Sequence, residues 1–456
     1  MADISDRKPR HVVAVVGAAT AGSEIARVLS DRGVMVVVIE QNPRPYGKIE
    51  DGLPRWHVKQ RKDEYKEINQ RLDQPNVEYV PMSRLGRDIP FDELRAAWGL
   101  SAIVLTHGAW RDRPFPVEGA DQFIDRGLVY QNPLIYWFNH YPEKSYQGPT
   151  YELSPGATVV GGGLASFDVV KVLQIEMALA ALRQRGIDEE MIRLEREGIE
   201  PVLKSHKLDW AQLGIRPCTL FYRRRVIDMP LSDVPPNALP KRAEAMRQAR
   251  SKILDKARRK YLFDFEERHV PTGLLILNGR MAGVELSKTE VSDGRVRTLP
   301  DTSQPVHSEL TISSIGSIPE PIPGIPQRGE VYQYVDESRG LLMEGPTAVY
   351  AAGNVLTGKG NIKDSLESGT AVATHVVEQY LGVADDGTTF SLADAPESRQ
   401  ARHEAERIAS SLTAREPLPV STVAEIMRRV RARQATVGYE GNYREWLARV
   451  TPPDLQ

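Results

Sequence analysis

The stretch VVGAATAGSEIA, residues Val15–Ala26, connects an apolar run to a helical pattern through a glycine-containing loop. The common dinucleotide-binding loop reads G-x-G-x-x-G, and here Gly17 and Gly22 hold the outer positions while Ala19 stands in the middle. The middle glycine lets backbone N–H groups approach a pyrophosphate, and a methyl group there tightens the fit without removing a donor. We therefore predict dinucleotide contacts at Gly17, Ala19, Ala21 and Gly22.

The segments around this loop predict a βαβ unit. Val12–Val16 is a short continuous apolar run, as expected for a buried parallel strand, and a helical pattern follows as far as Gly33. The next apolar run, VMVVVIE, ends at Glu40, about 20 residues beyond the loop, where a carboxylate can accept hydrogen bonds from both hydroxyls of an adenosine ribose. Such a carboxylate suits FAD or NAD and repels a 2′-phosphate. The alternative is a helix start that contains glycine by chance, and the βαβ setting weakens it.

A second strand–glycine–helix unit, ATVVGGGLASFDVVKVL, spans Ala157–Leu173. Two such units in one chain are far more specific than one. The strand that follows ends in LFYRRR, so Arg223 and Arg224 stand where the first unit has Glu40, and a guanidinium pair there suits a 2′-phosphate. The alternative is a solvated strand end. We predict FAD at the first unit and NADP at the second. The second loop contributes the contacts Gly161, Gly163, Ala165 and Ser166.

A third glycine-containing segment, AAGNVLTGKGNI, spans Ala351–Ile362. An apolar run ends in it, and a glycine-rich turn leads into a helix start, which places backbone amides and a positive helix end near one point. Such a point would stabilise the negative charge of a reduced flavin. The alternative is a simple turn between a strand and a helix. The predicted contacts in this segment are Gly353, Asn354, Gly360, Asn361 and Ile362.

Composition limits the classes of function. The chain has 456 residues, of which 41% are hydrophobic and 26% charged, enough for two globular domains. A net charge of −2 gives no global attraction to nucleic acid or anionic lipid, and no run approaches the ~20 apolar residues of a membrane span. The first residues, MADISDRKPR, match neither a secretory signal nor a transit peptide, so we expect a cytoplasmic protein. We predict no metal site, and the single cysteine, Cys218, excludes a four-cysteine iron–sulfur cluster and a redox disulfide within the chain.

Taken in order, the motifs resemble those of the adrenodoxin-reductase-like ferredoxin–NADP reductases and, by shared ancestry, the small subunit of glutamate synthase, over roughly Val12–Leu381. PRPYGKIEDGLPRWH is similar to the family's flavin-side loop, VYQNPLIYWFNHYPE to its W-Y-N-G-type segment, and SSIGSIPEPIPGIP to its domain-crossing stretch. YRRRVIDMP is similar to the Y-R-R…M-P segment of the glutamate synthase relatives. The chain departs from the family at Ala19, at Asn354 in place of aspartate, and at THGA in place of ATGA, and it lacks the cysteine-rich segment of the glutamate synthase subunits.

The resemblance implies an α/β fold with two Rossmann-like dinucleotide-binding domains, as in glutathione reductase. The implied segments are an FAD domain made of residues 1–112 and 319–380, an NADP domain of residues 113–318 inserted in it, and a helical C-terminal extension of residues 381–456. In the extension, the pattern predicts a helix near Thr422–Gln434, with Thr422 and Glu425 spaced as a capping box.

The resemblance also implies a reaction, in which NADPH reduces FAD and electrons then pass to a ferredoxin-type iron–sulfur protein. It implies an FAD contact at Gly47 and a catalytic role near the flavin for His57, with packing beside Trp56 as the alternative. Gly108 is a further predicted FAD contact, whereas His107 is expected to be structural. Two other functions stay open: an electron-input subunit of a larger complex, and a nucleotide-sensing flavoprotein without turnover. We expect no nucleic-acid or membrane partner, and the oligomeric state is open.

The segment Lys241–Lys260, KRAEAMRQARSKILDKARRK, contains nine basic residues against Glu244 and Asp255. It has helical propensity and follows the predicted 2′-phosphate arginines. In the family this region presents basic residues to an acidic iron–sulfur protein, so we predict that Arg247 and Arg250 dock such a partner. The alternative is a solvated helix face, which is what most charge runs are.

Overall fold

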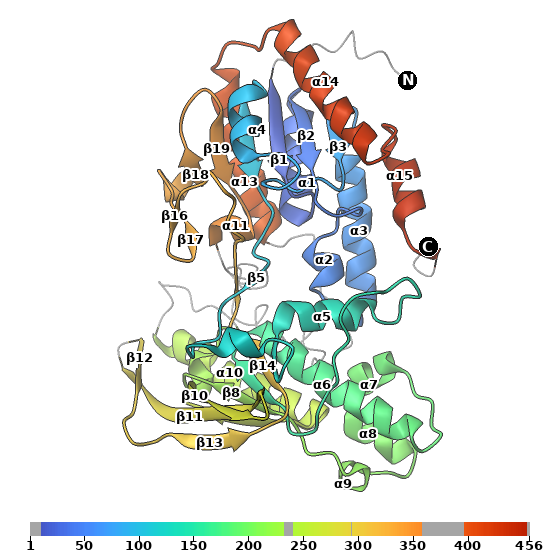
Figure 1. Cartoon of the computed structure of the whole chain (residues 1–456), viewed down its shortest axis with the longest axis vertical. Helices are drawn as coiled ribbons and strands as arrows, with labels where there is room; N and C mark the ends of the chain where they lie inside the picture. Colours follow the sequence, from blue (N-terminus) through green and yellow to red (C-terminus); the bar gives the residue numbers. More distant parts are fainter. Residues whose placement is uncertain (1–10, 232–239, 293, 358–395, 454–456) are drawn as a thin grey trace.

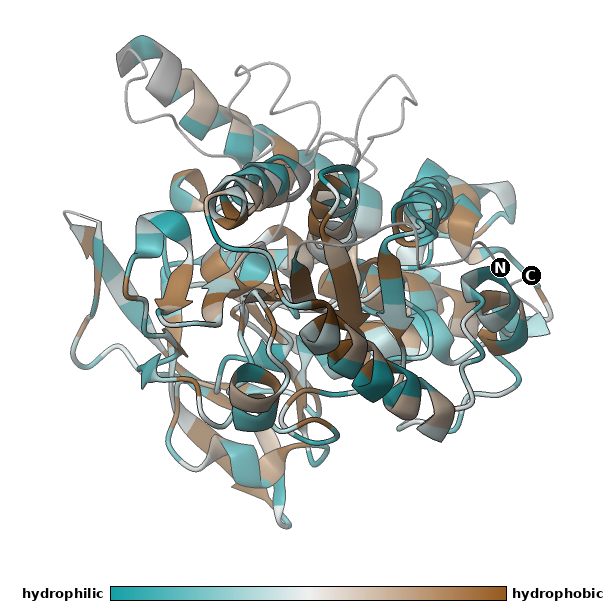
Figure 2. Cartoon of the chain, turned by 90° about the horizontal axis from the view of Figure 1, so that it is seen from above, coloured by the Kyte–Doolittle hydropathy of each residue, from teal (hydrophilic) through white to brown (hydrophobic). Residues whose placement is uncertain are grey.

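The computed structural model describes residues 11–231, 240–292, 294–357 and 396–453, which form two α/β units arranged along the long axis of the molecule (Figure 1). Each unit contains a mostly parallel sheet, and each of the two predicted glycine loops follows a central strand of one sheet. Viewed from above, hydrophobic strands lie between helices whose outer faces are hydrophilic (Figure 2). This is the layered arrangement that buried parallel strands require.

The first sheet is built around β1 (Val12–Val16), the strand predicted before the first glycine loop. β1 pairs in parallel with β2 (Met35–Ile39) on one side and with β4 (Ala102–Leu105) on the other. All three strands are fully buried, as their continuous apolar sequences require. The complete spatial order is β18 (Leu341–Met343), β19 (Ala348–Ala351), β4, β1, β2 and β3 (Val77–Val80), in which β18 alone is antiparallel to its neighbour.

The helix that follows the first loop is α1 (Thr20–Asp31), which packs beside α3 (Val58–Leu72) on one face of this sheet. It begins two residues before Gly22, because the chain turns directly from Ala19 into the helix. The shorter helices of this unit are α2 (Lys48–Asp51), α4 (Phe91–Ala97) and α11 (Asn354–Thr357).

The second sheet is entirely parallel. Its spatial order is β6 (Leu128–Tyr130), β14 (Thr311–Ser314), β7 (Thr158–Gly161), β8 (Thr219–Tyr222) and β9 (Asp264–Glu267). The long helix α6 (Leu164–Arg183) follows the second glycine loop and is buried over most of its length. The other helices of this unit are α5 (Gln131–His140), α7 (Met191–Glu197), α8 (Ile199–Ser205), α9 (Trp210–Leu213) and α10 (Pro240–Tyr261). An antiparallel layer joins β10 (His269–Leu277), β11 (Arg280–Ser292), β12 (Arg295–Thr298) and β13 (Gln304–His307).

The chain passes between the two units along a small antiparallel ribbon. In it, β5 (Arg111–Asp112) pairs with β15 (Ser317–Ile318), so the outgoing and returning segments lie side by side. A further short hairpin, β16 (Gln327–Arg328) with β17 (Val331–Tyr332), follows the return. The predicted fold class, two α/β dinucleotide-type units with additional helices, is confirmed. The exact domain boundaries stay predictions, and residues 358–395 lie outside the described part of the chain.

The C-terminal extension packs against the first unit rather than standing apart (Figure 1). Its helices are α13 (Pro396–Thr413), which packs on α1, α14 (Val420–Thr436), which packs near β3, and α15 (Tyr443–Val450). The helix predicted near Thr422–Gln434 is α14. The predicted capping box is wrong: α14 begins after Pro419 without a side-chain cap, and Glu425 instead binds Arg428 and Arg429 within the helix. Among the described residues, no helix has the length and apolar content of a membrane span.

Candidate functional site

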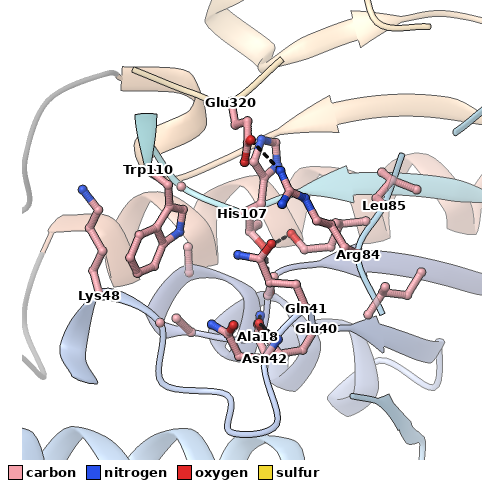
Figure 3. Close-up of a pocket in the computed structure, with 18 of the residues that line it drawn as sticks. Ala18, Glu40, Gln41, Asn42, Lys48, Arg84, Leu85, His107, Trp110 and Glu320 are labelled. Atoms are coloured by element: carbon pink, nitrogen blue, oxygen red, sulfur yellow. Dashed lines mark hydrogen bonds and ion pairs between the residues drawn. The ribbon is translucent and has the colours of Figure 1, made fainter. Parts of the chain in front are cut away.

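A cleft opens where the strands of the first sheet end and α1 begins, and its empty space, including open solvent at the mouth, is about 1030 Å³. Its walls come from the segments after β1, β2, β3 and β4 and from the returning chain near Glu320 (Figure 3). The carboxyl ends of parallel strands are where α/β sheets bind nucleotides. The cleft brings together seven of the predicted contacts, namely Gly17, Ala19, Ala21, Glu40, Gly47, Gly108 and Asn354.

Two glycines of the first loop have no room for a side chain. At Gly17 the backbone has a positive φ of 102°, and an added Cβ would lie 2.7 Å from the carbonyl oxygen of Thr106. At Gly22 an added Cβ would lie 1.8 Å from the carbonyl oxygen of Gly17. Gly22 therefore does not line the cleft, but it allows α1 to start directly behind the loop. Gly353 acts in the same way from the opposite side, since its added Cβ would meet that of Ala21 at 2.9 Å.

Ala19 occupies the position of the middle glycine in the first dinucleotide-binding loop. It takes an extended conformation at the N-cap of α1 and lines the cleft. A Cβ added at Gly47 would lie 3.0 Å from the Ala19 methyl, so Gly47 makes the space that the methyl occupies. The substitution of alanine for glycine is thus accommodated by the flavin-side loop across the cleft.

Glu40 is held with its carboxylate facing the loop. Its Oε2 accepts a hydrogen bond from the Ala18 N–H at 2.9 Å, and its Oε1 accepts one from the Asn42 N–H at 2.9 Å. The residue is only 5% exposed, and this burial raises the pKa of Glu40 to about 7, while the backbone hydrogen bonds act in the opposite direction. The two bonds leave each oxygen with a second lone pair for a ligand hydroxyl. This is the strand-end position and chemistry that the sequence predicts.

Several residues of the cleft were not predicted as contacts. Arg84, just after β3, reaches across to Glu320, with a nitrogen–oxygen distance of 2.5 Å (Figure 3). His107, expected to be structural, lines the cleft between them and is 3.3 Å from the Tyr332 hydroxyl through Nε2. Its Nδ1 is buried and has no hydrogen-bond partner among the described residues. Burial lowers the pKa of His107 to about 4, so the ring is neutral near pH 7 and can exchange one hydrogen bond with a ligand.

The opposite end of the cleft contains Trp110 and Lys48 (Figure 3). The Lys48 ammonium lies 5.4 Å from the centre of a Trp110 ring, within cation–π distance. It also lies 3.4 Å from Asn132 Oδ1 on α5 and 3.4 Å from Ser317 Oγ on the returning strand. Lys48 therefore connects the flavin-side loop to the second unit and to the crossing ribbon. Only the sheet topology brings these residues together, so the local sequence carries no direct signal for the set.

His57 does not line the cleft. It precedes α3, where its ring lies near Lys171 and Glu195 of the second unit, and burial lowers its pKa to about 3. The neighbouring Trp56 is buried, and the Lys171 ammonium sits 4.4 Å from the centre of its ring. His57 thus lies at the contact between the two units as a neutral ring. Its catalytic role stays a prediction.

The second glycine loop follows β7 and likewise leaves no room for a side chain at its first two glycines. A Cβ added at Gly161 would lie 2.2 Å from Ser166 Oγ, and one added at Gly162 would lie 2.1 Å from the Tyr222 ring. Ser166 is fully buried and donates to the Ser314 carbonyl at 3.1 Å, which ties the start of α6 to β14. Gly163, by contrast, has open space, since its nearest neighbour would be Pro230 at 4.0 Å. The half-buried Gly163 and Ala165 leave the N-terminus of α6 accessible to a ligand.

Arg223 and Arg224 follow β8, beside this loop. Arg223 is exposed and Arg224 half-buried, and neither forms an ion pair within the described residues. The next arginine, Arg225, differs because its guanidinium binds Asp228 through two hydrogen bonds of 2.8 and 2.9 Å. The first two guanidinium groups are therefore available to an anion and the third is not.

The two residues of α10 that were predicted to dock a partner differ in exposure. Arg247 is half-buried, and its guanidinium lies 3.7 Å from the Glu244 carboxylate. Arg250 is only 8% exposed and donates to the Ile227 carbonyl, so its predicted role as a docking residue is wrong. It lies on the inner face of an amphipathic helix, where the long side chain ties α10 to the segment after β8.

Of the predicted contacts in the third glycine-containing segment, Gly360, Asn361 and Ile362 lie outside the described residues. Within the described ranges, no group of three or more possible ligand side chains could hold a metal ion.

Comparison with known proteins finds relatives that share part of this chain's sequence, although no family model matches it. The chain is 25% identical over 214 residues to "NADPH:adrenodoxin oxidoreductase, mitochondrial" of Arabidopsis thaliana, which is 44% of this chain and 43% of that protein. It is 29% identical over 195 residues to "Glutamate synthase [NADPH] small chain" of Mycobacterium tuberculosis, covering 39% and 37% of the two chains. It is also 29% identical over 208 residues to "NADPH-Fe(3+) oxidoreductase subunit beta" of Geobacter sulfurreducens, covering 40% and 28%. The aligned part thus spans less than half of each of these relatives.

A solved structure matches almost the whole chain. "Mycobacterium tuberculosis FprA in complex with NADPH" superposes with a TM-score of 0.60 and 17% sequence identity, over 93% of this chain and 90% of that one. At this identity the match is evidence for the fold alone. The fold therefore extends along the chain beyond the sequence similarity. The resemblance stated from the motifs is confirmed: the chain is similar in sequence to NADPH:adrenodoxin oxidoreductase and to glutamate synthase small chains, and it has the fold of FprA.

Proposed function

We propose that the protein is an FAD-dependent NADPH oxidoreductase that passes electrons to a ferredoxin-type iron–sulfur protein. The observation that carries the proposal is the cleft at the first glycine loop, where Glu40 is oriented by two backbone N–H groups and Gly17 and Gly22 leave space only for backbone. A buried carboxylate with free lone pairs beside such a loop suits the ribose and pyrophosphate of a dinucleotide.

The residues present fit FAD. Glu40 would accept the ribose hydroxyls, the N-terminal amides of α1 would face the pyrophosphate, and Gly47, Gly108 and Trp110 would border the flavin. The buried Nδ1 of His107, which has no partner among the described residues, is a further polar group that a bound ligand would satisfy. When bound, a flavin supplies two-electron exchange with a nicotinamide and one-electron exchange with a metal cluster. The protein residues bind and orient it and exclude water from the cleft.

The second unit suits NADPH. Arg223 and Arg224 have no carboxylate partner among the described residues, and they flank a loop whose helix N-terminus is accessible. Paired guanidinium groups recognise a phosphate through charge-assisted hydrogen bonds. Three relatives are each named for NADPH, which supports the same choice.

Two observations support an acidic iron–sulfur protein as the electron acceptor. One relative is named for adrenodoxin, and the exposed side of α10 has basic residues that would attract an acidic protein. A shallow depression on that helix is lined by Lys252, Lys256, Arg258 and Arg259 together with Asp255 and Phe263. Arg250 is not part of this surface.

A second candidate function is an electron-input subunit of a larger complex. The observation that favours it is that two relatives are named as a small chain and as a subunit beta. Stoichiometric co-purification of the untagged chain with one partner from its native source would support this second function over the freestanding enzyme.

Flavin content is the direct test of the proposal. We expect the purified or reconstituted protein to be yellow, with about one FAD per chain released on denaturation. A colourless protein that takes up no FAD on titration would overturn the assignment of the cleft and with it the proposed function.

A further inference from the structure

The C-terminal extension reaches the rim of the dinucleotide cleft. On α14, Arg433 donates from Nε to Ser83 Oγ at 2.7 Å and from Nη2 to the Met82 carbonyl at 2.9 Å. Ser83 and the adjacent Arg84 line the cleft beside Glu40. One arginine of the extension thus holds two consecutive residues of the loop that follows β3.

This loop has a conformation that needs outside support. Met82 has a positive φ of 50°, which is uncommon for a side chain of this size and costs free energy. The Met82 N–H donates to the Asn42 carbonyl at 3.3 Å, and the Ser83 N–H donates to the Glu40 carbonyl at 2.8 Å. The strained turn therefore fixes the backbone at Glu40 itself, and Arg433 fixes the turn.

The loop after β2 is fastened in the same way by the next helix. Trp446 of α15 is buried, and its indole N–H donates to the Pro43 carbonyl at 2.8 Å. Pro43 directly follows Asn42. The Asn42 N–H donates to Glu40 Oε1, and Asn42 also lines the cleft. Both loops that flank the predicted ribose carboxylate are therefore each held from behind by one side chain of the extension.

We propose that Arg433 and Trp446 are positioning residues for the adenosine half of FAD, which act by holding the two loops that orient Glu40. This inference rests on the proposed function, because it needs FAD in the cleft. It assigns a role to the extension, which lies outside the region of motif resemblance. The extension then determines how tightly the cofactor is retained.

The chain offers a matched control on the same helix. Arg431 of α14 binds both carboxylate oxygens of Glu78 on β3 at 2.7 and 2.8 Å, but it touches no residue that lines the cleft. Arg431→Ala removes a comparable contact between the same helix and the strand that precedes this loop. A purely structural role for these arginines predicts similar effects of Arg431→Ala and Arg433→Ala.

The experiment titrates each full-length apoprotein with FAD and monitors binding by the quenching of flavin fluorescence. The thermal unfolding midpoint of each apoprotein is measured alongside. We expect Arg433→Ala to raise the Kd for FAD about tenfold and Trp446→Phe to raise it severalfold. Arg431→Ala should leave the Kd within about twofold of wild type, and Arg433→Lys should recover part of the loss. Trp446→Phe keeps an aromatic ring in the core while removing the N–H donor, so it serves if Arg433→Ala does not fold.

The outcomes separate the two claims. An unchanged Kd in both Arg433→Ala and Trp446→Phe, or equal losses in the Arg431 and Arg433 variants, would overturn the positioning role while the proposed function stands. A wild-type protein that binds no FAD would instead remove the proposed function, and the positioning role with it.

Discussion

Gly22 is the residue at which the first loop tolerates least change. A Cβ there would lie 1.8 Å from the Gly17 carbonyl, a distance that forces the loop or the start of α1 to move. Movement would displace the N–H groups that the loop presents to the cleft. The methyl of Ala19, by contrast, already faces the space left by Gly47.

We therefore expect Gly22→Ala to weaken FAD binding by at least about tenfold, whereas Ala19→Gly should change it by no more than about threefold. Both values come from titrating apoprotein with FAD. Strong retention of flavin by Gly22→Ala would show that the loop does not contact the cofactor as proposed.

Glu40 predicts a pH dependence with a definite sign. Its pKa is raised to about 7, mainly by burial, so the carboxyl is largely protonated at pH 6 and largely ionised at pH 8. Acceptance of two ribose hydroxyls favours the ionised form, so binding releases a proton below the pKa. FAD affinity should consequently rise severalfold from pH 6 to pH 8.

The Glu40→Gln variant is the control for this prediction. It cannot ionise, so it should bind FAD more weakly and with a much flatter pH profile. Glu50 and Glu64 also have pKa values raised to about 7 by burial, but neither lines the cleft and both are unchanged in the variant. An equal slope in the two proteins would mean that another group is titrating.

At this scale the sequence predicts residues whose place follows from one strand or one loop. Glu40 is recognisable because it ends an apolar run at a fixed distance from a glycine loop. Arg84, His107 and Glu320 are not recognisable, because they come from three separate segments that only the sheet order brings together. The prediction that Arg250 docks a partner was wrong, because charge alone does not show which side of a helix faces the core.

At the scale of elements, the end of β8 should decide between the two nicotinamide nucleotides. Replacing Arg223 and Arg224 with glutamine should raise the KM for NADPH by at least about tenfold with little effect on NADH, since charge-assisted bonds to a phosphate are lost. Arg225→Gln is the matched control, because that guanidinium already binds Asp228. Equal losses for the two nucleotides in the double variant would assign the arginines a structural role.

The helix α10 should act on the rate of electron transfer to an acidic partner. Reversing the exposed residues Lys252 and Arg259 to glutamate should slow the reduction of an acidic ferredoxin severalfold at low salt, and raised salt should shrink the difference. Reduction of the bound flavin by NADPH should be unaffected. Transfer at the wild-type rate at low salt would place the docking site elsewhere.

Elements marked by large apolar residues were predictable from the sequence, and elements built mostly from small and polar residues were not. β1 has the predicted bounds, because a short continuous apolar run before a glycine loop is typical of a buried parallel strand. The helix α14 was predicted, but α13 and α15 were not, since the extension is rich in polar residues and three of the five buried apolar residues of α13 are alanines. Their apolar residues make sense only against α1 and β3, which are remote in sequence.

At the scale of the whole molecule, the two units are held together by more than the crossing ribbon. Arg55 of the flavin-side loop lies between the rings of Phe138 and Tyr141, at 4.5 and 4.6 Å, and binds Glu176 on α6 at 3.1 Å. Trp56 packs into the core of the second unit. The order of motifs predicted two dinucleotide units, but this contact surface follows from side chains in loops that no periodic pattern marks.

In the proposed function, the first unit holds FAD, the second unit holds NADPH, and NADPH reduces the bound flavin. Anaerobic titration of the FAD-loaded protein with NADPH, followed by flavin absorbance, tests this claim most directly. We predict bleaching of the flavin band that is complete near one NADPH per FAD, with NADH much less effective. A flavin that stays oxidised in the presence of excess NADPH would contradict the account.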